Sequence, residues 1–163
     1  MHFNNPKNAS KMKRTNFQLT PHFSYDEMTF SAWAETHNAD NTPDCLQQAA
    51  LENLCRKFME PLYAKFGPVT VRSAFRTEQV NIGHHGVGCS KHLSGEAVDI
   101  SLPDEQTGRA YFRFLKTLPD IDQMFFEYDR HGDMWLHLSS CLDARENRHQ
   151  LFPNYRMTYD EDL

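Results

Sequence analysis

The sequence predicts an α+β domain with a small, mainly antiparallel sheet and flanking helices. Apolar residues recur at helical spacing over residues 42–66, and Gly67-Pro68 ends that pattern. The spacing then changes to the period of two that is typical of strands, at 69–73 and again at 97–102. A chain of 163 residues is long enough for one such domain. The later elements are expected to be a helix at 104–118 and strands at 123–128 and 134–140.

The longest predicted helix opens at Thr42 and Pro43. Thr42 can accept hydrogen bonds from the first backbone amides, and Pro43 occupies a position where a missing N–H costs nothing. Pro61 is expected to kink the helix. Upstream, residues 24–28 are expected to form a short helical turn, followed by irregular chain to Asn41. The apolar stripe of the long helix consists of Leu46, Ala50, Leu54, Phe58, Leu62 and Phe66.

Two of the predicted strands carry polar side chains on the face that is turned away from the core. In strand 97–102 the apolar residues alternate with Asp99, so the Asp99 carboxylate is expected to point away from the core. In strand 134–140 the residues Leu136 and Leu138 are expected to face the core. The opposite face of that strand then carries Trp135, His137 and Ser139.

The chain is expected to divide into three parts. Residues 1–20 are polar and without a sustained period, which predicts a flexible leader. Residues 21–142 carry the periodic segments, and they are expected to form the folded domain. Residues 143–163 are predicted to be a tail that packs on the domain or trails from it. We expect a monomer.

Charge and targeting signals exclude several classes of protein. There are 17 Lys and Arg residues against 22 Asp and Glu residues, for a net charge of −5, which argues against a dedicated nucleic-acid binder. No segment is apolar enough to span a bilayer, and no signal peptide is recognisable, so we expect synthesis in a cytoplasm without membrane insertion. The four cysteines are scattered and are expected to be reduced thiols.

Three residues are candidate metal ligands. His92 lies in a loop just before the strand that carries Asp99, and Gly95 allows that loop to fold back tightly. If strand 134–140 lies beside strand 97–102, His137 can converge on Asp99 and His92. Two neutral imidazoles and one carboxylate are a usual ligand set for catalytic zinc, and they leave a fourth position for water. Cys89 is a weaker competitor as a thiolate ligand.

Such a site also needs a general base, and two carboxylates are candidates. Symmetric pairing about Gly132 places Glu127 opposite His137, at about 4.5–5.5 Å between β-carbons, and makes it the first choice. Asp133 shares the alternation of His137 and is the alternative, although it lies nearer the exposed turn.

The motifs resemble those of a known family. The string S-K-H-L-S-G-E-A-V-D at 90–99 is similar to the S-x-H-x-x-G-x-A-x-D signature of the zinc D-alanyl-D-alanine carboxypeptidase and dipeptidase superfamily, which shares its fold with the hedgehog signalling domain. The segments S-A-F-R-T at 73–77, D-Q-M-F-F-E at 122–127 and W-L-H-L-S at 135–139 resemble further motifs of that family. The resemblance runs from about Pro21 to Ser140, and it implies a hedgehog or DD-peptidase-like fold.

Carried over by position, the resemblance implies one zinc ion held by His92, Asp99 and His137. It implies Glu127 as general base and Arg76 as the cation that binds the substrate carbonyl or the developing oxyanion. Ser90 and Trp135 are further candidate substrate contacts, and packing is the other interpretation of Trp135. Nearby, His84 and His85 could be substrate contacts, a second metal site or plain loop residues.

The function implied by the resemblance is zinc-dependent hydrolysis of peptide bonds in bacterial cell-wall peptidoglycan, often next to D-alanine. Both carboxypeptidase and endopeptidase activity fit. Because no signal peptide is recognisable, we expect a phage lysis enzyme (an endolysin) or a virion-associated enzyme that acts at the wall after release from the cytoplasm. The alternative is a non-catalytic binding or structural module of the same fold, stabilised by zinc.

Overall fold

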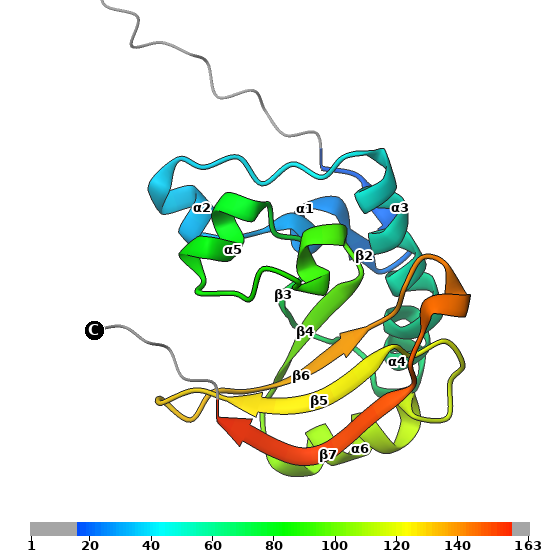
Figure 1. The fold of residues 1–163 in the computed structure, drawn as a ribbon. Helices are drawn as coiled ribbons and strands as arrows, with labels where there is room; N and C mark the ends of the chain where they lie inside the picture. The colour runs from blue at the N-terminus through cyan, green and yellow to red at the C-terminus, as the bar shows by residue number, and fades with distance from the viewer. Residues whose placement is uncertain (1–15, 158–163) are drawn as a thin grey trace, which may run out of the picture.

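The protein is described by a computed structural model that covers residues 16–157 (Figure 1). The strands are β1 Gln18–Thr20, β2 Phe23–Ser24, β3 Val71–Ser73, β4 Ala97–Leu102, β5 Gln123–Tyr128, β6 Met134–Ser139 and β7 Gln150–Met157. The α-helices are α1 Tyr25–Thr29, α2 Ala32–His37, α3 Cys45–Leu54, α4 Glu60–Phe66, α5 Glu78–Gly83 and α6 Glu105–Leu115. The other helical turns are η1 Cys55–Met59, η2 Lys91–Ser94 and η3 Ala144–Glu146.

A five-stranded sheet with the order β3-β4-β6-β5-β7 organises the molecule. All neighbours pair antiparallel except β5 and β7, which run parallel. A second, two-stranded sheet joins β1 to β2. The architecture confirms the predicted α+β class with a mainly antiparallel sheet. None of the helices within residues 16–157 has the length and apolar character needed to cross a membrane.

The hydrophobic core lies on one face of the main sheet. Alternate residues of β4, β5 and β6 point into it. Helix α6 and the continuous helix formed by α3, η1 and α4 cover the core from the other side. This continuous helix contributes fully buried side chains such as Leu51, Phe58 and Leu62. Burial of these strands from one side leaves the alternate side chains of the same strands on the opposite face, where the polar residues gather. The core residues of the three strands are Val98, Ile100 and Leu102, then Met124 and Phe126, then Leu136 and Leu138.

The long helix begins three residues later than predicted. Its N-cap is Asp44, whose carboxylate accepts a hydrogen bond from the backbone N–H of Gln47 at 2.8 Å, and Gln47 returns one to the backbone of Asp44. The N-cap is therefore Asp44 and not Thr42, because Asp44 forms this reciprocal pair of hydrogen bonds. The Thr42 hydroxyl donates instead to the Asp40 carboxylate. Leu46, assigned to the apolar stripe, is 72% exposed because it lies in the first turn, on the side away from the core.

The expected kink at Pro61 takes the form of a π-helical turn. Proline lacks an N–H and its ring clashes with the carbonyl four residues earlier, so the regular pattern cannot continue through it. The preceding turn η1 widens, and the N–H of Glu60 bonds to the carbonyl of Cys55. The helix then continues as α4 to Phe66, and the left-handed backbone of Gly67, with φ of 84°, ends it.

Four elements were not predicted from the sequence. Helix α2 replaces the irregular chain expected before Asn41, and α5, capped by the Thr77 hydroxyl, lies in a predicted loop. Strand β1 lies in the expected leader, and β7 lies in the expected tail. Short or polar strands of this kind have no periodic signal of their own, and pairing with a neighbouring strand creates them. Residues 1–15 and 158–163 lie outside the described residues, and the domain boundaries stay predictions.

Candidate metal centre

The face of the sheet opposite the core carries two rows of side chains. Antiparallel pairing places Asp99 of β4 opposite His137 of β6, and His137 opposite Phe125 of β5. The next row contains Ser101, Trp135 and Glu127, in the same strand order. Directly paired residues share a face, so these six side chains lie on the same surface of the sheet. All of them except Ser101 border one cleft.

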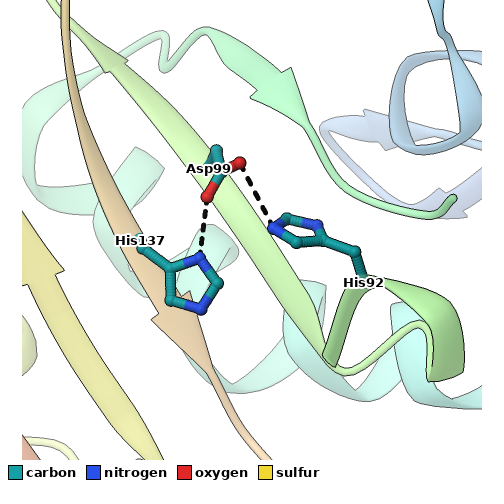
Figure 2. Close-up of side chains that lie close together, drawn as sticks. All are labelled: His92, Asp99 and His137. Atoms are coloured by element: carbon teal, nitrogen blue, oxygen red, sulfur yellow. Dashed lines mark hydrogen bonds and ion pairs between the residues drawn. The ribbon is translucent and has the colours of Figure 1, made fainter. Parts of the chain in front are cut away.

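The three candidate ligands converge at one point on this face. His137 Nδ1 lies 2.8 Å from Asp99 Oδ1, and His92 Nε2 lies 3.2 Å from Asp99 Oδ2. Figure 2 shows the carboxylate between the two imidazole rings, each with a nitrogen turned toward it. All three residues are at most 9% exposed, so the cluster is almost completely withdrawn from bulk water.

The turn η2 brings His92 to the start of β4. The Ser90 hydroxyl caps this turn by accepting a hydrogen bond from the backbone N–H of His92. The turn ends at Gly95, whose φ of 73° favours glycine, and a β-carbon there would lie 2.4 Å from the carbonyl oxygen of Gln47. His92 Nδ1 lies 2.5 Å from the carbonyl oxygen of Ala74 and can only donate to it, which leaves the lone pair on Nε2.

The electrostatics of the cluster favour a neutral imidazole beside an ionised carboxylate. Burial lowers the pKa of His92, and this effect exceeds the opposing attraction of Asp99. Burial by itself raises the pKa of Asp99, but His92 and the hydrogen bond from His137 outweigh it and hold that pKa well below its usual range. The donor set is therefore an anionic oxygen with imidazole lone pairs, which suits a divalent cation.

Ligand atoms of His92, Asp99 and His137 all lie within 4.8 Å of one another, the only such group of three or more His, Cys, Asp or Glu found within residues 16–157. Cys89, the competing ligand weighed from the sequence, is exposed and does not belong to this group. His84 and His85 border the same cleft, and His84 Nε2 lies 3.3 Å from the Ser31 hydroxyl, so no second metal site forms from them among the described residues. The site accordingly fits one ion.

Arg76 lies directly beside the cluster and is largely buried. Its Nη2 donates to Asp99 Oδ2 at 3.0 Å, and its Nε donates to the Ser73 hydroxyl at 2.9 Å. Its backbone N–H bonds to the carbonyl of His92, which ties the Arg76 segment to η2. Asn41, only 1% exposed, bonds to Thr29, Phe75 and Thr77 and fixes the same segment. The guanidinium is therefore held in place by contacts on several sides.

The hairpin register differs from the predicted one. The strands pair about His131 rather than Gly132, so Glu127 lies opposite Trp135, and Phe125 lies opposite His137. The turn is anchored by Asp129, whose carboxylate accepts hydrogen bonds from the N–H groups of His131 and Asp133, and this anchoring determines the register. Glu127 still shares the face of His137, two residue pairs farther along the hairpin.

Glu127 is half-buried and hydrogen-bonded by the residue opposite it. The indole Nε1 of Trp135 donates to Glu127 Oε2 at 2.8 Å. The guanidinium of Arg72 lies over the Trp135 ring, 4.3 Å from its centroid, and also bonds to Asp129. Trp135 is thus positioned by Arg72 and holds Glu127. The alternative base, Asp133, has a side chain that is 69% exposed and lies 3.8 Å from Arg72.

A cleft of about 310 Å³ opens over this face. The candidate ligands, the first-choice base and the candidate substrate contacts border it, from both the sheet and the loops that precede β4, whereas Asp133 and Cys89 do not. Phe125 also borders the cleft and stacks on His137, with ring centroids 4.4 Å apart. The candidate site residues are His92, Asp99, His137, Arg76, Glu127, Ser90 and Trp135.

Comparison with known proteins agrees with this geometry. Residues 21–138 match the family model Peptidase M15. The chain belongs to the Peptidase M15 family. This result confirms the resemblance found in the motifs, and it makes the protein a member of a family of zinc-dependent metallopeptidases. No curated protein matches the chain.

Three neighbours of the site in this M15 family member were not found from the sequence. Phe125 was detectable, because alternation in β5 places it on the face of Glu127. Asn41 stands in the Asn-Thr-Pro segment, but nothing in that string reveals its distant partners. Arg72 reads as an ordinary exposed strand residue, and only the tertiary structure places it against Trp135.

Proposed function

We propose that this M15 family member hydrolyses peptide bonds of bacterial cell-wall peptidoglycan, with one zinc ion held by His92, Asp99 and His137. One observation carries the proposal: the three ligands converge in a cleft that Glu127 and Arg76 also border. A binding module stabilised by zinc would need the ligands alone. The wall-peptide substrate is supported by the motif resemblance, which covers the segments that carry these residues.

His92 would bind the ion through Nε2, because its Nδ1 donates to Ala74. His137 would bind the ion through Nδ1, the nitrogen that faces Asp99, with the ring proton on Nε2. When bound, the ion lowers the pKa of a coordinated water toward neutrality and polarises the substrate carbonyl. Asp99 supplies the negative charge that balances part of the charge of the ion, and its buried position strengthens that attraction.

Glu127 takes the proton of the attacking water and passes it to the leaving amine. Its position suits this work because it shares the face of His137 and borders the same cleft. The Trp135 N–H donates a hydrogen bond to one carboxylate oxygen, Oε2, and so fixes the orientation of the carboxylate beside the cleft. We therefore assign Trp135 the role of orienting the base, and the substrate contact expected from the sequence stays a prediction.

Arg76 stabilises the negative charge that grows on the carbonyl oxygen. A donor that is already fixed stabilises such charge most, because it does not reorganise during the reaction. The bonds of Arg76 to Ser73 and Asp99 provide that fixed position and use only Nε and Nη2. Its remaining nitrogen, Nη1, is the group that we assign to the substrate.

Trp135→Phe is expected to lower kcat by roughly 10- to 100-fold, because the substitution removes a hydrogen bond to a charged group and keeps an aromatic ring beneath Arg72. The zinc content should stay unchanged, since Trp135 is not a ligand. Steady-state kinetics and elemental analysis measure the two quantities. Trp33→Phe, on α2, is the matched control and should retain full activity. A wild-type kcat for Trp135→Phe would contradict the orienting role.

Digestion of purified peptidoglycan followed by mass spectrometry of the soluble products tests the function. The zinc-loaded protein is expected to add one water for each bond cut, and chelation should abolish the products. Release of single amino acids identifies a carboxypeptidase, and release of paired fragments identifies an endopeptidase. Intact wall peptides after prolonged incubation with zinc would contradict the proposal.

The proposal extends to action at the wall after release from the cytoplasm, as in phage lysis. Expression inside bacteria is expected to lyse the cells only when the inner membrane is permeabilised as well. Lysis without permeabilisation would contradict this part of the proposal alone.

A further inference from the structure

A second hollow, of about 390 Å³, adjoins the cleft of the metal centre. The two share Val87, Ser90, Phe125 and His137 as lining residues, so they are continuous past the stacked rings of His137 and Phe125. Glu127 and Arg76 border the cleft of the metal centre but not the second hollow. A peptide whose scissile bond lies at the metal centre can therefore extend into the second hollow.

Arg148 is a fixed cation in the wall of this hollow. Its Nε and Nη2 donate to the two oxygens of Asp122, both at 2.7 Å. The Asp122 side chain is completely buried, and it also accepts a hydrogen bond from the Ser139 hydroxyl. Half of the Arg148 side chain remains exposed, at 49%, and no contact of its Nη1 occurs among the described residues. The arrangement holds the guanidinium rigidly and leaves one edge toward the hollow.

A second cation lies nearby. Lys91 Nζ is 2.8 Å from Glu96 Oε2 and 3.2 Å from Cys141 Sγ, and its side chain is 29% exposed. The acidic residues of the region are Asp122, which Arg148 neutralises, Glu96, which Lys91 neutralises, and the exposed Glu146. Water screens the charge of Glu146, so the unsatisfied donor of Arg148 dominates recognition inside the hollow.

The wall that carries Arg148 lies outside the part of the chain that matches the family. The match ends at residue 138, while Cys141, Glu146 and Arg148 follow it and line the hollow. Strand β7 continues directly from this segment and pairs with β5, which anchors the wall to the sheet. The fixed cation of the hollow therefore lies beyond the matched region, although most of the other lining residues lie within it.

We propose that this hollow is a subsite for a carboxylate of the peptide substrate, with Arg148 as its specificity-determining residue and Lys91 as a supporting cation. The inference rests on the proposed function, since it places the carboxylate beside a bond that is cut at the metal centre. The carboxylate belongs either to the free end of the peptide or to an acidic side chain. Both sources present the same planar group to the guanidinium.

Binding measurements test the subsite independently of turnover. The probe is a synthetic peptide with one Glu and a D-Ala-D-Ala end, prepared as the free acid, with a terminal carboxamide, and with Gln in place of Glu. The zinc-loaded full chain carrying Glu127→Gln is titrated with each form by calorimetry. One amidated form is expected to bind about tenfold more weakly than the free acid, and its identity reveals the source of the carboxylate.

Arg148→Gln should abolish that difference, whereas Arg145→Gln, at a side chain that is 90% exposed and outside the hollow, should retain it. If Arg148→Gln fails to fold because Asp122 is left buried and unpaired, the double variant Asp122→Asn, Arg148→Gln removes both charges and takes its place. Equal binding of all three forms, binding of none, or a difference that survives the loss of Arg148 would overturn the inference. A preference for the carboxylate in a protein that cuts no wall peptide would overturn the proposed function alone.

Discussion

Glu127→Gln is expected to lower kcat by about 10²- to 10⁴-fold, because an amide cannot accept the proton that a general base removes from water. The amide keeps the size of the side chain, and one of its polar atoms still faces Trp135. The zinc content and thermal stability of the variant should therefore match those of the wild type. Kinetics on a wall peptide, elemental analysis and thermal unfolding measure these quantities.

Asp133→Asn is the matched control for Glu127→Gln. Its carboxylate lies at the exposed end of the same hairpin, 3.8 Å from Arg72, and its loss is expected to change kcat less than threefold or so. If Asp133→Asn were inactive and Glu127→Gln active, Asp133 would be the general base in place of Glu127. This comparison decides between the two bases that the sequence left open.

His137→Ala is expected to abolish both zinc binding at micromolar zinc and peptidase activity. A site of three protein ligands loses one third of its donors, and the remaining pair holds the ion too weakly. His131→Ala, at the exposed hairpin tip, should bind zinc and cut substrate normally. Elemental analysis after dialysis and kinetics with added zinc provide the measurements.

Thermal unfolding gives a readout of the same site that does not depend on activity. Zinc at 100 times its dissociation constant stabilises the folded state by about 2.7 kcal/mol, which corresponds to a rise in Tm of roughly 5–10 °C for a domain of this size. The rise should occur for the wild type and be absent for His137→Ala. An equal rise in both proteins would place the ion elsewhere, and no rise in the wild type would exclude a zinc site.

Trp135, Arg72 and Asp129 form a connected support for the proposed base. The Asp129 carboxylate organises the hairpin tip and binds Arg72, whose guanidinium covers the Trp135 ring. The indole in turn holds Glu127. The hairpin therefore supports the Glu127 carboxylate through its own side chains and keeps it at a defined place beside the cleft.

Much of the fold was predictable because local patterns report it directly. The change of period after Gly67-Pro68 separated the long helix from the strands, and the strands 123–128 and 134–139 have the predicted positions. Elements without a pattern were missed. Strand β7 has no regular alternation, contains Pro153 and pairs with β5 through a shifted register, and α5 has only six residues.

What the sequence determined by itself is the face on which each candidate ligand lies. Side chains alternate along a strand, so the apolar neighbours of Asp99 and His137 oblige both polar side chains to point away from the core. The motif S-K-H-L-S-G-E-A-V-D likewise predicted the tight turn at Gly95 that returns His92 to the strand. These are local consequences of residue type and spacing.

Only the tertiary structure decided which side chains meet. The register of the hairpin depends on hydrogen bonds at Asp129, and it placed Phe125 rather than Glu127 opposite His137. The ion pair between Arg76 and Asp99 joins residues 23 positions apart, and Arg148 reaches Asp122 across 26 positions. Such contacts arise when separate segments are packed against one sheet, and their energies depend on burial and distance, which spacing along the chain does not encode.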